Sequence, residues 1–190
     1  MRKMPIVIDT REQKPLDFSP FPDVRTVRAD GIWPGDYTLQ AAANLVAVER
    51  KSVSDLIGTM KDGYNGFNAT RPKRFNRELA ALRGYPRGGS GRAFVLVEPD
   101  VRGQTAEEQI RAGNYRAMIP PEKILAFIQS IRDLWLVDVV LAESREHAAE
   151  VVVSSFRPFM GYKAVAREIA STDPAPDAPG PSAPSTEDPF

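Results

Sequence analysis

Three charged residues, Glu49, Arg50 and Lys51, follow one another where a buried strand should end. The segment LVAVERKSVSD, residues 45–55, starts with an apolar run that is typical of an interior strand. Charges at such a place cost free energy unless something compensates them. Because side chains alternate across a strand, Glu49 and Lys51 share one face and Arg50 points to the other. A carboxylate and an ammonium group at a strand end could form a catalytic edge.

Two aspartates could reach the same edge. Asp36 begins the preceding predicted strand, in the segment PGDY, and Asp9 ends the first predicted strand. Two carboxylates about 4 Å apart repel by roughly 4 kcal/mol at an effective dielectric of 20, and a divalent cation removes that repulsion. A site in which the protein supplies only a few oxygen ligands favours Mg²⁺ or Mn²⁺, since water and a substrate phosphate complete the shell. Such an ion acidifies a bound water and offsets negative charge on the phosphate. We therefore expect a metal-dependent phosphodiesterase centre assisted by Lys51; the alternative is a solvated pair of Glu49 and Lys51.

Alternating strand and helix patterns would position these residues. Ser52, with Asp55 three residues on, and Ser144 are the expected helix caps. After an initial meander of strands, helices and strands alternate, which predicts an α/β fold with a mixed central β-sheet flanked by helices. The expected strands are 4–9, 24–29, one from about 36, 44–51, 92–99 and 136–142, and the expected helices are 52–60, 72–85, 120–135, 144–160 and 161–170.

Composition narrows the class of protein. The chain has 190 residues, which suits one domain of ordinary size. It has no cysteine and one histidine, His147, which excludes thiolate and multi-histidine metal sites; we expect His147 to be solvated or a local cap. The N-terminus lacks the apolar core of a signal peptide, and no apolar run is long enough to span a membrane. We expect a soluble, intracellular protein, cytoplasmic or nucleoid-associated.

The last twenty residues differ from the rest. Residues 171–190 are rich in Pro, Ala and Ser and contain four acids and no base, so we expect a disordered acidic tail. Residues 1–170 are the expected folded domain, with a net charge of about +4 once the acids of the tail are set aside.

The segment 61–92 is rich in positive charge: it contains eight lysine and arginine residues and only two acidic residues, Asp62 and Glu78. Such density suits contacts with phosphates, and interleaved aromatic rings could stack on unpaired bases. The alternative is a solvated basic face above a buried Phe75, Leu79 and Leu82. The candidate DNA-binding residues are Lys61, Tyr64, Arg71, Lys73, Arg74, Arg77, Arg87 and Arg92.

The segments IVIDTRE, GDY and VERKSVSD, in this order, resemble the nuclease domain of the XPF family of structure-specific endonucleases. The family's hallmark is Gly-Asp followed by Glu-Arg-Lys-x-x-x-Asp, after an upstream Asp-x-Arg-Glu element. The segments RFNREL and AFVLVE also resemble later parts of the family, and the resemblance covers roughly residues 4–156. The residues that match the hallmark are Asp9, Arg11, Glu12, Gly35, Asp36, Glu49, Arg50, Lys51 and Asp55.

The resemblance implies a restriction-endonuclease-like fold and Mg²⁺- or Mn²⁺-dependent cleavage of DNA at branched, flap or fork structures, in repair or recombination. It implies that Asp36 and Glu49 are metal ligands with Lys51 beside them, and that Asp9 supports the metal site. Arg11, Glu12, Arg50 and Asp55 would complete the signature.

Simpler roles remain open for the supporting residues. Asp55 could only cap a helix, Arg50 could pair with Asp55 or Glu12, and Arg11 and Glu12 could order the loop after the first strand. Glu98 also matches a family position, and we interpret it as structural.

We expect the chain to depart from the family in two respects, the absence of a helicase domain and of a second DNA-binding domain. Cellular members carry a tandem helix-hairpin-helix domain after the nuclease, and residues 157–170 are too few for it. A homodimer or a separate duplex-binding partner could replace that domain. The alternative function is a catalytically inactive, nuclease-like subunit that binds DNA or an active partner; against it, Asp36, Glu49 and Lys51 are all present.

Overall fold

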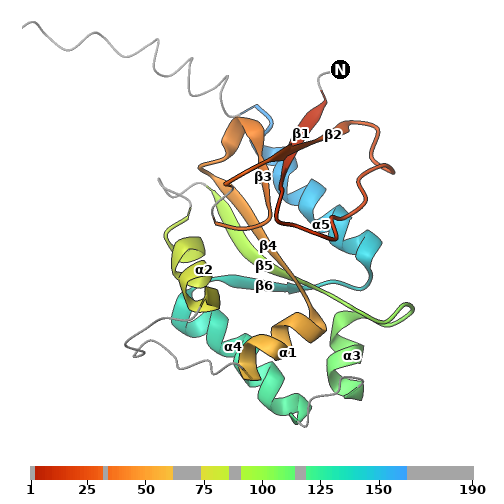
Figure 1. The fold of residues 1–190 in the computed structure, drawn as a ribbon, viewed down its shortest axis with the longest axis vertical. Coiled ribbons are helices and arrows are strands. Elements are labelled where there is room, and N and C mark those ends of the chain that lie inside the picture. The colour runs from red at the N-terminus through yellow and green to blue at the C-terminus, as the bar shows by residue number, and fades with distance from the viewer. Residues whose placement is uncertain (1–2, 32–33, 62–73, 86–90, 114–118, 162–190) are drawn as a thin grey trace, which may run out of the picture.

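The computed structural model describes residues 3–31, 34–61, 74–85, 91–113 and 119–161 (Figure 1). Its centre is a six-stranded mixed sheet in the order β2-β1-β3-β4-β5-β6. This confirms the predicted α/β fold with a mixed sheet. The strands are β1 (Met4–Asp9), β2 (Val24–Ala29), β3 (Tyr37–Leu39), β4 (Val46–Ser52), β5 (Arg92–Glu98) and β6 (Asp138–Leu141).

The first strands do not form the expected meander. β1 pairs with β2 in parallel and with β3 antiparallel, so that prediction is wrong. A parallel pair needs a long connection, and residues 10–23 supply it. Leu16 and Phe18 of this connection are buried against the sheet, which explains why a proline-rich loop here contains large apolar residues. The loop thereby adds to the core that the sheet forms with α5.

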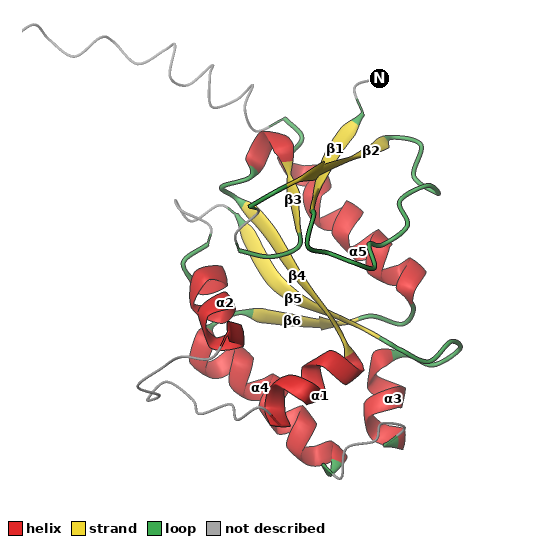
Figure 2. Cartoon of the chain, viewed as in Figure 1, coloured by secondary structure: helices red, strands yellow, loops and turns green. Residues whose placement is uncertain are grey.

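Helices cover both faces of the sheet, as Figures 1 and 2 show. One face packs against α5 (Arg145–Phe156), and the other packs against α1 (Val53–Lys61), α2 (Arg74–Arg83) and α4 (Pro121–Trp135). A further short helix, α3 (Ala106–Ala112), was not predicted, although Thr105 and Glu108 form a capping box at its start. Short 3-10 segments cover Gln40–Ala42 and Arg157–Phe159.

Two apolar cores divide the residues of β4 between them. Val46 and Val48 belong to the core under α5, whereas Ala47 belongs to the core under α1, α2 and α4. Strand alternation continues beyond them, so Arg50 lies on the α5 face while Glu49 and Lys51 lie on the other. β4 thus carries different chemistry to the two sides of the sheet at its carboxyl end.

Several predictions concern helix ends and termini. Ser52 and Ser144 accept hydrogen bonds from the backbone N–H groups of Asp55 and His147, which confirms both as caps. The side chain of His147 accepts a hydrogen bond from the N–H of Glu143, a local contact as expected. The predicted helix 161–170 and the tail 171–190 lie outside the described residues, apart from Gly161. No helix in the described ranges is both long and apolar enough to cross a membrane.

Gly35 fixes the start of β3 against β4. Its φ is +95°, and a Cβ at this position would lie 2.7 Å from the carbonyl oxygen of Val48. Both the backbone conformation and the close approach therefore require glycine. The next residue, Asp36, donates its N–H to the same carbonyl at 2.8 Å. The glycine of the Gly-Asp motif thus sets the position of Asp36.

We expect Gly35→Ala to lower the free energy of unfolding by about 1–3 kcal/mol from backbone strain, with a further loss from the clash with Val48. Urea denaturation measures the loss. Gly103→Ala is the matched control, because Gly103 has a φ of +81° and open space around its Cβ position. Equal losses in the two variants would show that the contact with β4 does not matter.

Candidate active site

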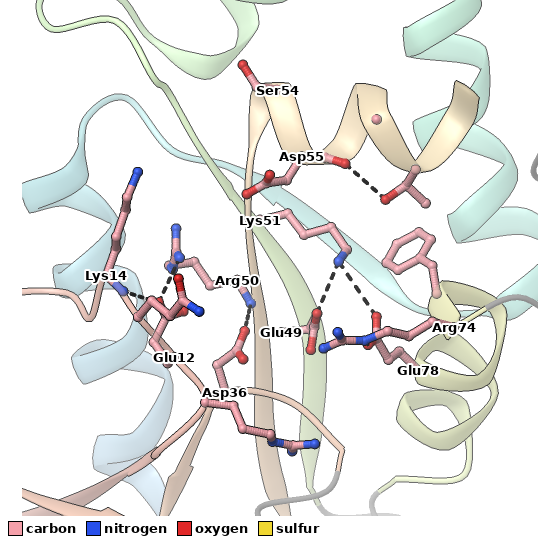
Figure 3. A pocket seen from close by; sticks show the side chains of 15 residues that line it. Glu12, Lys14, Asp36, Glu49, Arg50, Lys51, Ser54, Asp55, Arg74 and Glu78 are labelled. Atoms are coloured by element: carbon pink, nitrogen blue, oxygen red, sulfur yellow. Dashed lines mark hydrogen bonds and ion pairs between the residues drawn. The ribbon is translucent and has the colours of Figure 1, made fainter. Parts of the chain in front are cut away.

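A pocket of about 900 Å³ opens where the carboxyl end of β4 meets α1, α2 and the loop after β1 (Figure 3). It collects residues that lie far apart in the sequence. Eight of the predicted site residues line it: Arg11, Glu12, Asp36, Glu49, Arg50, Lys51, Asp55 and Arg74. The structure therefore brings the three parts of the motif together.

Asp36 is held between two strands. Its carbonyl accepts the N–H of Asp9 at 2.9 Å, and its N–H reaches Val48 of β4. Its carboxylate oxygen Oδ2 accepts the backbone N–H of Arg50 at 2.9 Å. This N–H lies two residues beyond Val48, the last residue of β4 that pairs with β3. This fixes the Asp36 carboxylate at the edge of the pocket.

Glu49 and Lys51 form a pair on the pocket side of β4. The Lys51 Nζ lies 3.2 Å from Glu49 Oε1. Both side chains are largely buried, with 9% of the Glu49 side chain and 13% of the Lys51 side chain exposed. This agrees with the shared strand face that the sequence predicts, and it excludes a solvated surface pair.

The two carboxylates stand in an environment that favours their neutral forms. Burial raises the pKa of Glu49 to about 8, and the charge of Asp36 adds to the shift while Lys51 opposes it. Burial also raises the pKa of Asp36 to about 6, against the hydrogen bond from Arg50. The positive charge in the pocket therefore compensates these acids only in part, which is the condition that a bound cation would relieve.

Asp9 does not line the pocket. Its two carboxylate oxygens accept hydrogen bonds from the Arg11 guanidinium at 2.8 and 2.9 Å, and Oδ1 also accepts the Arg11 N–H. The Asp9 carboxylate raises the pKa of Arg11, and the charges of Asp36 and Glu49 add smaller effects in the same direction. Arg11 therefore interacts electrostatically with both pocket acids. Asp9 thus acts on the site through Arg11 in this structure, and direct metal binding by Asp9 stays a prediction.

Arg50 turns away from Lys51 and forms a buried cluster on the other face. Its Nε and Nη2 donate to Glu12 at 2.8 and 2.9 Å, and its Nη1 donates to Glu98 Oε1 at 2.5 Å. Arg145, at the start of α5, also binds Glu98 Oε1. Burial alone would lower the pKa of Arg50, but Glu12 and Glu98 outweigh it and the pKa is raised. Of the partners expected for Arg50, the structure shows Glu12, and it adds Glu98.

Asp55 is exposed at the first turn of α1, on the pocket wall. Its backbone N–H binds the Ser52 side chain at 3.1 Å, so this end of α1 is capped by Ser52. The N-terminal turn is held further by Asp100, which accepts from the N–H and the hydroxyl of Ser54 at 2.8 and 2.9 Å. Asp55 itself is left facing the pocket.

Sequence reasoning missed Glu78 as a site residue. In the sequence, Glu78 is one of two acidic residues in a basic segment. In the structure, α2 places it in the pocket with 2% of the residue exposed. Its Oε2 lies 3.6 Å from Lys51 Nζ, and its Oε1 accepts from Arg74 Nε at 2.7 Å. The available signal was its position on the helix, since Glu78 shares the inward face with Phe75, Leu79 and Leu82.

The predicted DNA-binding residues fall into three groups. Arg74 lies at the pocket, with 78% of its side chain exposed. Arg77 is exposed on α2, and Arg92 is exposed at the amino end of β5, several residues along the sheet from the pocket. The side chains of Lys61, Tyr64, Arg71, Lys73 and Arg87 lie outside the described residues.

A divalent cation fits the donors that the pocket presents. Among the residues that the structure describes, no three acidic or histidine side chains are gathered closely enough to form a metal cluster by themselves. Asp36 and Glu49 nevertheless offer hard oxygen donors whose raised pKa values show uncompensated burial and repulsion. Mg²⁺ and Mn²⁺ are commonly held by one or two carboxylates, with water and substrate phosphate completing the shell.

We expect the metal-free protein to lose stability as the pH rises from about 5 to 8. The pKa of Glu49 in the folded state, about 8, lies above its value in the unfolded chain, so the folded state binds more protons in this window. Urea unfolding with a chelator at pH 5, 6.5 and 8 measures the slope. Glu49→Gln should flatten it, and Mn²⁺ at pH 8 should restore stability to the wild type. Parallel profiles of the two proteins would contradict the raised pKa.

Arg50→Met tests the buried cluster. It would leave Glu12 and Glu98 in the interior without this guanidinium, and we expect a loss of about 3–5 kcal/mol in the free energy of unfolding at pH 7. Arg111→Met is the control, since the pair of Arg111 with Glu107 is exposed, and it should cost less than about 1 kcal/mol. A small loss for Arg50→Met in urea denaturation would mean that the cluster contributes little to the fold.

Comparisons with known proteins agree with this arrangement. The model of the ERCC4 domain family matches residues 8–155. No curated protein matches the chain.

Two solved structures share its fold. XPF from Aeropyrum pernix is 19% identical, with a TM-score of 0.55 over 87% of this chain and 69% of that one. XPF from Aeropyrum pernix in complex with DNA is 18% identical, with a TM-score of 0.54 over 84% of this chain and 66% of that one.

The family match includes every predicted catalytic and supporting residue, from Asp9 to Asp55. The structural likeness, at these identities, concerns the fold. Because the family match spans more than half of its length, this chain belongs to the ERCC4 domain family and has the fold of an XPF-family nuclease domain.

Proposed function

We propose that this chain is a divalent-metal-dependent DNA endonuclease that hydrolyses phosphodiester bonds at branched, flap or fork structures. One observation carries the proposal: Asp36 and Glu49 are held in one pocket with raised pKa values, next to the Lys51 ammonium. In the structural cluster around Arg50, two guanidinium groups meet two carboxylates. The pocket keeps its acids short of positive charge, which is typical of a site built to receive a cation.

Each residue has a role that its position supports. Asp36 and Glu49 would hold Mg²⁺ or Mn²⁺, which when bound would supply an acidified water and offset charge on the phosphate. Lys51 would orient that water or donate to the phosphate oxygens. Arg11, held by Asp9, places a positive charge near both acids, and the exposed Arg74 would contact a neighbouring phosphate of the backbone.

Two observations support DNA as the proposed substrate: the family to which the chain belongs and the exposed Arg74 beside the acids of the pocket. A solved relative of this fold, XPF from Aeropyrum pernix, is in complex with DNA. The preference for branched structures, a role in repair or recombination, and a homodimer or a separate duplex-binding partner are parts of the proposal that rest on the family resemblance. The second candidate, an inactive DNA-binding subunit, would have no use for two uncompensated acids beside a lysine.

The test is cleavage of end-labelled flap, fork, splayed-arm and plain duplex DNA with Mg²⁺ or Mn²⁺. We expect the wild type to cut near the branch, and Asp36→Asn, Glu49→Gln and Lys51→Met each to lower the rate at least about 100-fold. Glu150→Gln, on the exposed side of α5, is the control for loss of a carboxylate and should cleave as the wild type does.

Other outcomes would change the conclusion. A wild type that binds these DNAs and cuts none of them with either metal would favour the inactive subunit. Cleavage that survives in Asp36→Asn and Glu49→Gln would move the active site elsewhere. Equal cutting of plain duplex and branched DNA would leave the nuclease in place and remove the structural preference.

A further inference from the structure

Glu78 is a buried carboxylate that the predicted machinery does not use. It comes from α2, whereas the rest of the acidic site comes from β3 and β4 and their ends. Only 3% of its side chain is exposed, and both of its oxygens face cations: Oε1 binds Arg74 Nε at 2.7 Å and Oε2 lies 3.6 Å from Lys51 Nζ. Carboxylates are rarely buried unless they are paired with cations. The burial of Glu78 therefore depends on its two cationic partners, Arg74 and Lys51.

The Lys51 ammonium is enclosed from two sides, as Figure 3 shows for its two carboxylate partners. β4 supplies Glu49 Oε1 at 3.2 Å. α2 supplies Glu78 Oε2 and also the ring of Phe75, whose centroid lies 4.6 Å from Nζ. The position of this flexible side chain therefore depends on a helix that begins more than twenty residues later in the sequence.

Two carboxylates around one ammonium have a consequence for a metal site. Glu49 cannot offer its oxygen fully to a cation and to Lys51 at the same time. If Glu49 were the only partner of Lys51, metal binding would release the lysine into its many rotamers. Glu78 provides a second anionic partner for Lys51, and the Phe75 ring provides a cation–π contact. Both contacts would hold the ammonium in place while Glu49 binds the metal.

We propose that Glu78 is a positioning residue of the nuclease site, which holds the Lys51 ammonium beside Glu49 so that it faces the substrate phosphate. The inference rests on the proposed function. It predicts that the effect of Glu78 passes through Lys51, and not through the metal or through DNA affinity.

The first experiment is Glu78→Gln in the full chain. We expect kcat on the preferred DNA to fall about 10- to 100-fold, which is the usual effect of removing a group that orients a catalytic side chain. The KM for DNA and the affinity for Mn²⁺, measured by calorimetry on the DNA-free protein, should stay within about twofold. Glu150→Gln, which removes an exposed carboxylate of α5 outside the pocket, is the matched control and should leave kcat and KM as in the wild type.

A double-mutant cycle on stability tests the same contact without any activity. Glu78→Gln is made in the wild type and in Lys51→Met, and the midpoint of urea unfolding is measured for all four proteins with a chelator present. Without Lys51, Glu78 keeps only the exposed Arg74 as a cationic partner and still repels Glu49, so Glu78→Gln should raise the midpoint there. In the wild type it also removes a partner of Lys51, so the change should be smaller or opposite in sign.

The outcomes separate the possible errors. A loss of Mn²⁺ affinity in Glu78→Gln would make Glu78 a metal ligand and overturn the inference. Equal shifts of the midpoint in both backgrounds, or an unchanged kcat, would also overturn it. If the wild type cleaves no DNA, the proposed function fails, and the stability cycle still decides whether Glu78 holds Lys51.

Discussion

The buried guanidinium of Arg50 is the interaction on which the rest of the site depends. Its side chain binds Glu12 from the loop after β1 and Glu98 from the end of β5, while its backbone N–H binds the Asp36 carboxylate. One residue thus ties together three separate segments. A buried ion pair adds little net stability compared with an apolar contact, but a single missing partner is costly. The cluster therefore fixes the geometry of this edge more than it stabilises the fold.

The alternation of β4 separates two kinds of charge. On the α5 face, Arg50 and Arg145 meet Glu12 and Glu98 in short hydrogen bonds. On the opposite face, Glu49 shares one lysine with Glu78, and its pKa is raised. On the face of Arg50 two guanidinium groups thus match two carboxylates, whereas on the face of Glu49 the acids outnumber the buried positive charges. The side with Arg50 holds the backbone in place, and two acids of the other side, Asp36 and Glu49, are the proposed ligands of a cation.

The sequence was enough for those parts of the structure that depend on local order. Strand alternation correctly separated Arg50 from Glu49 and Lys51, and the hydroxyl caps at Ser52 and Ser144 were correctly identified. It failed where distant segments meet. The parallel pairing of β1 and β2 follows from how a long loop packs, and the pairing of Glu78 with Lys51 follows from how α2 docks on the sheet. The helical period places Glu78 on the inward face of α2 but does not reveal that this face meets Lys51, and no period reveals the pairing of β1 with β2.

The acids of the pocket also explain why glycine precedes Asp36. A Cβ at Gly35 would lie 2.7 Å from the carbonyl oxygen of Val48, so only glycine lets the chain come this close to β4. The Asp36 carboxylate thereby lies in the pocket with Glu49. Close approach increases the repulsion between the two acids, which lowers the stability of the metal-free protein as they ionise. In the proposed metal site, the same approach would raise the affinity for a divalent ion, because binding would relieve that repulsion. If the proposal holds, stability without metal and affinity for metal are opposed through one backbone contact.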